Sequence, residues 1–93
     1  MANVIQLETI DETHFRVRVS DAKSESVHSV RVQPSDVARL AGKSVPAESL
    51  VRASFEFLLE REPKESILPQ FNLTVIGRYF PEYEKEIRKK FAG

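Results

Sequence analysis

Cysteine and tryptophan are absent from this chain of 93 residues, which contains three glycines and one methionine. Without cysteine the chain can form no disulfide, no thiolate metal site and no thiol nucleophile. Three scattered glycines, at positions 42, 77 and 93, cannot build a glycine-rich loop for phosphate groups. Any chemistry must therefore come from histidine, carboxylate, hydroxyl and basic side chains.

An excess of charge of either sign is also absent, because fourteen basic residues balance fourteen acidic ones. No overall field therefore draws the chain to nucleic acid or to a membrane surface. No apolar run approaches the roughly 20 residues that span a bilayer. The first residues, Met-Ala-Asn-Val-Ile-Gln, lack the basic and apolar segments of a signal peptide. We expect a soluble, cytoplasmic protein that makes no membrane contact.

No internal repeat, low-complexity tract or linker divides the chain, so we expect a single domain over residues 1–93. A chain of this length buries about two-thirds of the surface that it exposes when unfolded. That is enough for a modest apolar core without disulfides or a structural metal.

The first third of the chain alternates between apolar and polar residues, as strands do. In residues 14–19, Phe15, Val17 and Val19 fall on one side of the chain. Residues 27–32 alternate in the same way, and residues 4–10 do so less regularly. Pro34 ends the pattern, because proline cannot donate to a strand ladder. We predict an antiparallel meander of about three strands with one buried face and one solvated face.

The remaining two-thirds favours helices, and the strongest helical pattern covers residues 44–63. Its apolar side chains cover about half of the circumference, so several elements should pack around it. Shorter helices are predicted at 36–41, 72–80 and 82–91, and residues 64–70 can form no more than one turn. Strands followed by three to four helices on one face of the sheet predict an α+β fold.

His14 and His28 are the only imidazoles of the sequence. Strand alternation places them on opposite faces of the sheet, so they cannot share a metal ion. Gly42-Lys43-Ser44 is similar to the end of a phosphate-binding loop, but Val37 stands where that loop needs its first glycine. We therefore predict no catalytic, metal or cofactor site. A small enzyme that uses His28 or His14 is the third alternative.

Four polar side chains share the solvated face of the predicted sheet, and we take them as candidate contacts for a partner or a nucleic acid. They are Arg16, Arg18, Ser29 and Arg31. Guanidinium groups on neighbouring strands can hold a phosphate or a carboxylate-rich partner. Alternatively this face is simply solvated, with its arginines neutralised by Glu8 or Glu12.

Three segments, 57–63 (Phe-Leu-Leu-Glu-Arg-Glu-Pro), 66–68 (Ser-Ile-Leu) and 79–84 (Tyr-Phe-Pro-Glu-Tyr-Glu), resemble a string found near the C-termini of a group of short bacterial proteins. The resemblance covers about the last half of the chain. It implies a bacterial, cytoplasmic protein and transfers no functional site. Because most of these residues are apolar, proline or helix-terminal, we expect them to maintain the fold.

Residues 29–62 resemble ribbon-helix-helix repressors and antitoxins, in which a short strand precedes two helices. In that family, paired strands from a homodimer enter the major groove of DNA. The resemblance implies that Ser29 and Arg31 read bases and that residues near Ser44 hold a phosphate. The chain departs from the pattern because the strand at residues 15–19 would occupy the edge that the twin strand needs.

The sequence thus leads us to expect a small non-catalytic module that binds another macromolecule, with a protein as the partner. This hypothesis rests on the lack of a cofactor loop, a metal ligand set and an acid–base constellation. A DNA-binding regulator of the ribbon-helix-helix type is the alternative, which would make nucleic acid the partner and the protein a homodimer.

Overall fold

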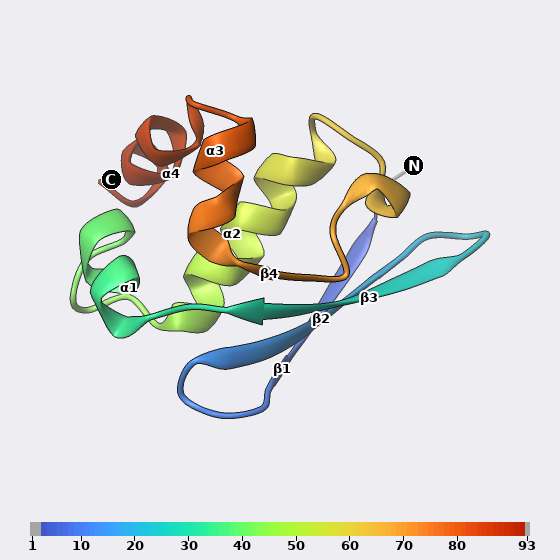
Figure 1. Ribbon diagram of the computed structural model, residues 1–93, viewed down its shortest axis with the longest axis horizontal. Coiled ribbons are helices and arrows are strands. Elements are labelled where there is room, and N and C mark those ends of the chain that lie inside the picture. The colour runs from blue at the N-terminus through green and yellow to red at the C-terminus, as the bar shows by residue number, and fades with distance from the viewer. Residues whose placement is uncertain (1–2, 93) are drawn as a thin grey trace.

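The computed structural model describes residues 3–92, in which the strands precede most of the helices, as the α+β prediction requires. The strands are β1 (Val4–Thr9), β2 (His14–Ser20), β3 (Glu25–Arg31) and β4 (Gln70–Asn72). The helices are α1 (Pro34–Leu40), α2 (Ala47–Leu59), α3 (Ile76–Tyr79) and α4 (Tyr83–Phe91), with short 3-10 turns η1 (Lys64–Ser66) and η2 (Leu73–Val75). The helices cover one face of the sheet (Figure 1). None of the described helices has the length and apolar character needed to cross a membrane.

The predicted antiparallel meander is confirmed for β1, β2 and β3. Phe15 pairs with Val30 and Val17 with His28, so the alternating side chains of both strands enter the same core. Val17, Val19 and Val30 are completely buried. The regular alternation of apolar residues in β2 therefore gave the correct inward face.

A fourth strand, β4, extends the sheet beyond the predicted meander and makes it mixed. It runs parallel to β3, with Ser29 opposite Gln70 and Arg31 opposite Asn72. The sheet order is β1-β2-β3-β4. The three residues of β4 alternate polar, apolar, polar, which is too short a run to predict a strand from sequence. The strand forms because α1, α2 and η1 return the chain to the edge of β3, a connection that parallel strands require.

Helix α2 lies at the centre of the molecule, as the sequence predicted, but it is shorter than residues 44–63. Leu50, Val51 and Phe55 have no exposed surface. The helix packs against β1, α1 and α4. It begins after Pro46, whose backbone is extended, and it ends before the turn that leads to Pro63.

The short helix predicted at 36–41 is α1, and Gly42 follows it with φ at 103°. This left-handed conformation suits glycine and ends the helix as expected. The helix predicted at 72–80 is instead split into η2 and α3, and the Asn72 side chain makes no cap bond. Phe80 becomes extended before Pro81, because a residue before proline avoids the helical region. Helix α4 agrees with the predicted helix at 82–91 to within one residue at its start.

Candidate functional site

The four polar residues predicted as contacts, Arg16, Arg18, Ser29 and Arg31, are exposed on the open face of the sheet. The antiparallel register sets Arg16 directly opposite Ser29 and His14 opposite Arg31. The structure therefore brings the four residues onto one surface. Their arrangement follows from the alternation of polar and apolar residues in β2 and β3, which can be seen in the sequence.

Each arginine of this face forms an ion pair or a hydrogen bond with a neighbouring side chain. Arg16 donates to Glu8 at 2.9 Å, and the nearest approach of Arg18 to Glu25 is 3.5 Å. Arg31 donates from Nε to His14 Nε2 at 3.1 Å. The acid that neutralises Arg16 is thus Glu8, one of the two that the sequence suggested. Exposed pairs of this kind contribute little to stability, but they leave the face with balanced charge.

His14 has both ring nitrogens engaged. Its Nε2 accepts from Arg31, so the proton lies on Nδ1, which is 3.0 Å from both carboxylate oxygens of Asp11. The backbone amide of Thr13 and the His14 ring together hold the pKa of Asp11 at about 2. The imidazole is therefore a bridge between an acid and a guanidinium group, and its basic nitrogen faces an arginine.

His28 lies on the opposite face from His14, as alternation predicted, and it is buried. Its Nε2 is 2.8 Å from the Ser26 hydroxyl, and its Nδ1 donates to the Leu68 carbonyl at 2.8 Å. The ring also packs on Phe55, with the centroids 5.5 Å apart. His28 therefore ties β3 to the segment that follows η1.

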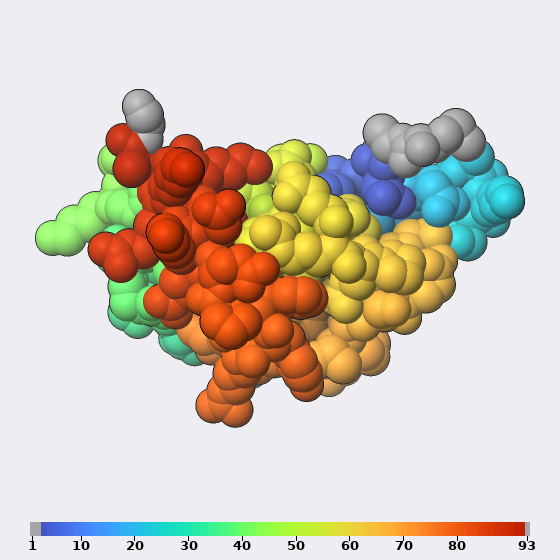
Figure 2. All heavy atoms as spheres, turned by 90° about the horizontal axis from the view of Figure 1, so that it is seen from above, coloured from blue at the N-terminus to red at the C-terminus, as the bar shows by residue number. Residues whose placement is uncertain are grey.

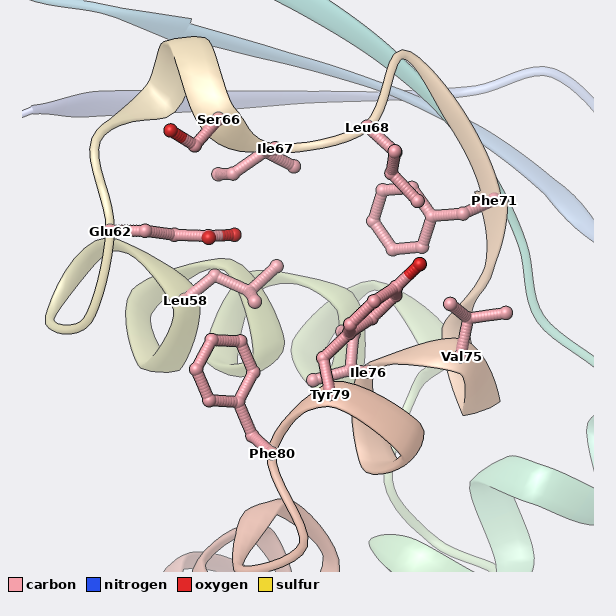
Figure 3. A pocket seen from close by; sticks show the side chains of 10 residues that line it. All are labelled: Leu58, Glu62, Ser66, Ile67, Leu68, Phe71, Val75, Ile76, Tyr79 and Phe80. Atoms are coloured by element: carbon pink, nitrogen blue, oxygen red, sulfur yellow. The ribbon is translucent and has the colours of Figure 1, made fainter.

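An apolar groove, which no sequence pattern indicated, opens on the helical side of the sheet between η1, β4 and α3 (Figure 3). The end of α2 forms its floor, and its volume is about 340 Å³. The contributing segments, yellow and orange in Figure 2, lie next to each other on that face of the molecule. The groove is lined by Leu58, Glu62, Ser66, Ile67, Leu68, Phe71, Val75, Ile76, Tyr79 and Phe80.

Glu62 is the one charged residue among the described residues that line the groove. Its side chain points into the groove from the turn after α2 (Figure 3). The residue is partly buried, and within residues 3–92 its carboxylate has no hydrogen bond or ion pair. The adjacent Arg61 turns elsewhere, 3.6 Å from the centre of the Phe57 ring and 3.2 Å from Glu82. The groove thus holds an unpartnered carboxylate against apolar walls.

Two large apolar side chains at the groove remain open to solvent, Leu68 at 43% and Tyr79 at 67% exposure. Figure 3 shows the Tyr79 ring crossing the groove towards Phe71 and Leu68. Exposed apolar side chains that gather around a concavity mark sites of interaction more often than isolated ones do. The groove therefore combines apolar contact surface with one polar group that can set orientation.

The groove wall from residue 64 to residue 68 is attached to the sheet at both ends. The buried Lys64 ammonium donates to Asp21 at 2.8 Å and to Glu65 at 2.6 Å. The hydrogen bond from Lys64 also holds the pKa of Asp21 well below its usual range. The bond from His28 fixes the Leu68 end. This wall is therefore held in place without a ligand.

Seven of the ten lining residues fall within the segments 57–63, 66–68 and 79–84 that the sequence singled out. The expectation that these segments maintain the fold fits Phe57 and Tyr83, which are buried. It does not account for Leu68 and Tyr79, which are largely exposed. Leu68, an apolar residue beside Pro69 and outside any helical repeat, was a signal for the groove, whereas Tyr79 fell within the helix predicted at 72–80.

Comparison with known proteins returned no matching family model, no matching curated protein and no matching solved structure. Both resemblances noted in the sequence therefore stay predictions.

Proposed function

We propose that the protein is a non-catalytic interaction module that binds a segment of another protein in the apolar groove. The observation that carries the proposal is the unpartnered Glu62 carboxylate between apolar walls. A partly buried charge without a partner is unfavourable, and a cation in the groove would relieve that cost. The expected occupant is a segment with one large apolar side chain and a lysine or arginine close to it.

The apolar part of the occupant supplies most of the binding free energy. A volume of about 340 Å³ holds one or two side chains and falls at the small end of ligand sites. Burying a leucine or phenylalanine side chain contributes about 1.5–3 kcal/mol. Because the wall at Ile67 and Leu68 is already attached to the sheet, little free energy is spent on ordering it.

Glu62 supplies the selectivity for a basic segment. A lysine or arginine beside the anchor forms a charge-assisted hydrogen bond with the carboxylate. An acidic residue at the same place would instead meet a like charge. The balanced charge of the whole chain adds no long-range attraction, so the preference arises locally.

The two other functions suggested by the sequence find less support. A ribbon-helix-helix reader needs a strand with a free edge for its twin, whereas β3 pairs with β2 on one side and β4 on the other. Ser29 and Arg31 do lie on the exposed face. The enzyme hypothesis needs a histidine with a basic nitrogen that a substrate can reach, whereas His28 is buried and the Nε2 of His14 accepts from Arg31.

A selection from a phage-displayed library of random peptides tests the proposal. We expect the enriched peptides to carry a large apolar residue and a lysine or arginine at a fixed spacing. Glu62→Gln should weaken the best peptide about three- to tenfold, which corresponds to about 0.7–1.4 kcal/mol for a partly screened ion pair. Fluorescence polarisation with the labelled peptide measures both affinities.

The matched control is Glu86→Gln, the same chemical change on the exposed surface of α4. It should leave the affinity unchanged. Tyr79→Ser removes part of the groove wall at a largely exposed position, so it should weaken binding and leave the fold intact. The proposal fails if no peptide is enriched, or if the enriched peptides bind the Glu62 and Tyr79 variants as well as the original protein.

A further inference from the structure

β4 is the last strand of the sheet, and its side away from β3 has no strand partner among the described residues. The opposite edge of the sheet differs, because Arg52 of α2 donates to the Ile5 carbonyl of β1 at 3.0 Å. Uncovered edge strands offer unpaired backbone groups to an incoming chain, and proteins commonly cover them. The sheet therefore has one edge with a covering contact and one edge that is open.

The backbone groups that point off the open edge follow from the register. The Ser29 amide donates to the Pro69 carbonyl at 2.8 Å, and Ser29 lies opposite Gln70. Hydrogen-bonding direction alternates along a strand, so the amide and carbonyl of Phe71 face β3. The amide and carbonyl of Gln70 and the amide of Asn72 then face away from β3. A further strand could therefore pair with two donors, the amides of Gln70 and Asn72, and one acceptor, the carbonyl of Gln70.

The groove adjoins this open edge. Leu68, Phe71 and Val75, which precede, form and follow β4, all line the groove. Figure 3 shows Leu68 and Phe71 directed into it, with Glu62 on the far side. In a strand, side chains two positions apart point to the same face. A chain that pairs with β4 would therefore direct alternate side chains into the groove.

We infer that the occupant binds by adding a strand to the free edge of β4, with its apolar and basic side chains at positions i and i+2. This inference rests on the proposed function and specifies its geometry. Main-chain hydrogen bonds to Gln70 and Asn72 hold the added strand. The groove selects its side chains. In other complexes where a peptide extends a sheet, main-chain bonds likewise give affinity and side-chain pockets give specificity. The basic side chain at the second inward position extends across the groove to Glu62.

Amide hydrogen exchange followed by NMR tests the inference, with the tightest peptide from the phage selection as the probe. Saturating peptide should slow exchange of the Gln70 and Asn72 amides at least tenfold. The Ser29 amide is the internal control, because it already donates within the sheet and should change little. In a second measurement, N-methylation of the peptide at alternate residues should weaken binding at least tenfold, whereas methylation between them should have little effect.

The outcomes separate the two proposals. If the peptide loses affinity for the Glu62→Gln variant but the Gln70 and Asn72 amides exchange at their original rates, strand addition is wrong and the groove proposal stands. Strand addition would also be wrong if N-methylation of the peptide at every position tested left its affinity unchanged. If no peptide binds at all, both proposals fall together.

Discussion

At the scale of single residues, the buried pair of Ser54 and Tyr83 shows how polar groups enter this core. Both residues have no exposed surface, and their hydroxyl oxygens are 2.7 Å apart. Ser54 donates to the Leu50 carbonyl, so the Tyr83 hydroxyl is the donor of the pair. Burial raises the pKa of Tyr83 to about 12, so this donor keeps its proton in mildly alkaline solution as well as at neutral pH. The pair joins α2 to α4 through one hydrogen bond.

This geometry predicts unequal costs for removing the two hydroxyls. Tyr83→Phe leaves Ser54 bonded to Leu50, so it should lower the free energy of unfolding by about 0.5–1.5 kcal/mol. Ser54→Ala leaves the tyrosine hydroxyl buried without an acceptor and should cost about 1–3 kcal/mol. Urea unfolding of the single and double variants measures both values. Equal losses, or a larger loss for Tyr83→Phe, would contradict the assigned donor.

At the scale of elements, α2 is the centre on which the sheet and the other helices pack. Phe55 is completely buried and contacts the rings of His28 and Phe71. Phe55→Ala should therefore lower the free energy of unfolding by about 3–5 kcal/mol. Glu56→Ala, on the exposed side of the same helix, removes only an exposed ion pair with Lys90 and should change it by no more than about 1 kcal/mol. Comparable effects in denaturant unfolding would mean that α2 is not the core element.

The elements that the sequence predicted well are those with a local periodic signal. β2 alternates without error, and α2 carries apolar residues around much of its surface. β4 could not be predicted in this way, because its three residues form a strand only where β3 lies beside them. The division of the helix predicted at 72–80 into η2 and α3 has no local signal either, whereas the end of α3 before Phe80 follows from Pro81.

The open sheet face could be predicted from the sequence, and the groove could not. Arg16 and Ser29 reach one face because both follow strand alternation. The groove joins Glu62 of the turn after α2, Leu68 of the segment before β4 and Tyr79 at the end of α3, and no spacing rule relates such positions. Lys64 is a second example, because its burial against Asp21 depends on a hairpin 43 positions earlier. Contacts between irregular segments are set by tertiary packing alone.

At the scale of the whole molecule, we expect a monomer at micromolar concentration. The edge of β1 is contacted by Arg52, and the open edge of β4 has only three residues, which is a short surface for pairing with a second copy. Size exclusion with light scattering measures the mass. A dimer that persists when peptide is added would contradict this expectation and revive the DNA-binding hypothesis. If the peptide dissociates the dimer, the second copy occupies the same edge of β4 as the peptide.

The two attachments of the groove wall have a kinetic consequence. They join residues 40 and 43 positions apart, Leu68 to His28 and Lys64 to Asp21. Contacts of such long sequence separation require the closure of a long loop, so they should form after the β2–β3 hairpin and α2 have assembled. Loss of the Lys64 attachment should then accelerate unfolding and leave the refolding rate almost unchanged. The wall would then assemble late in folding and open early in unfolding.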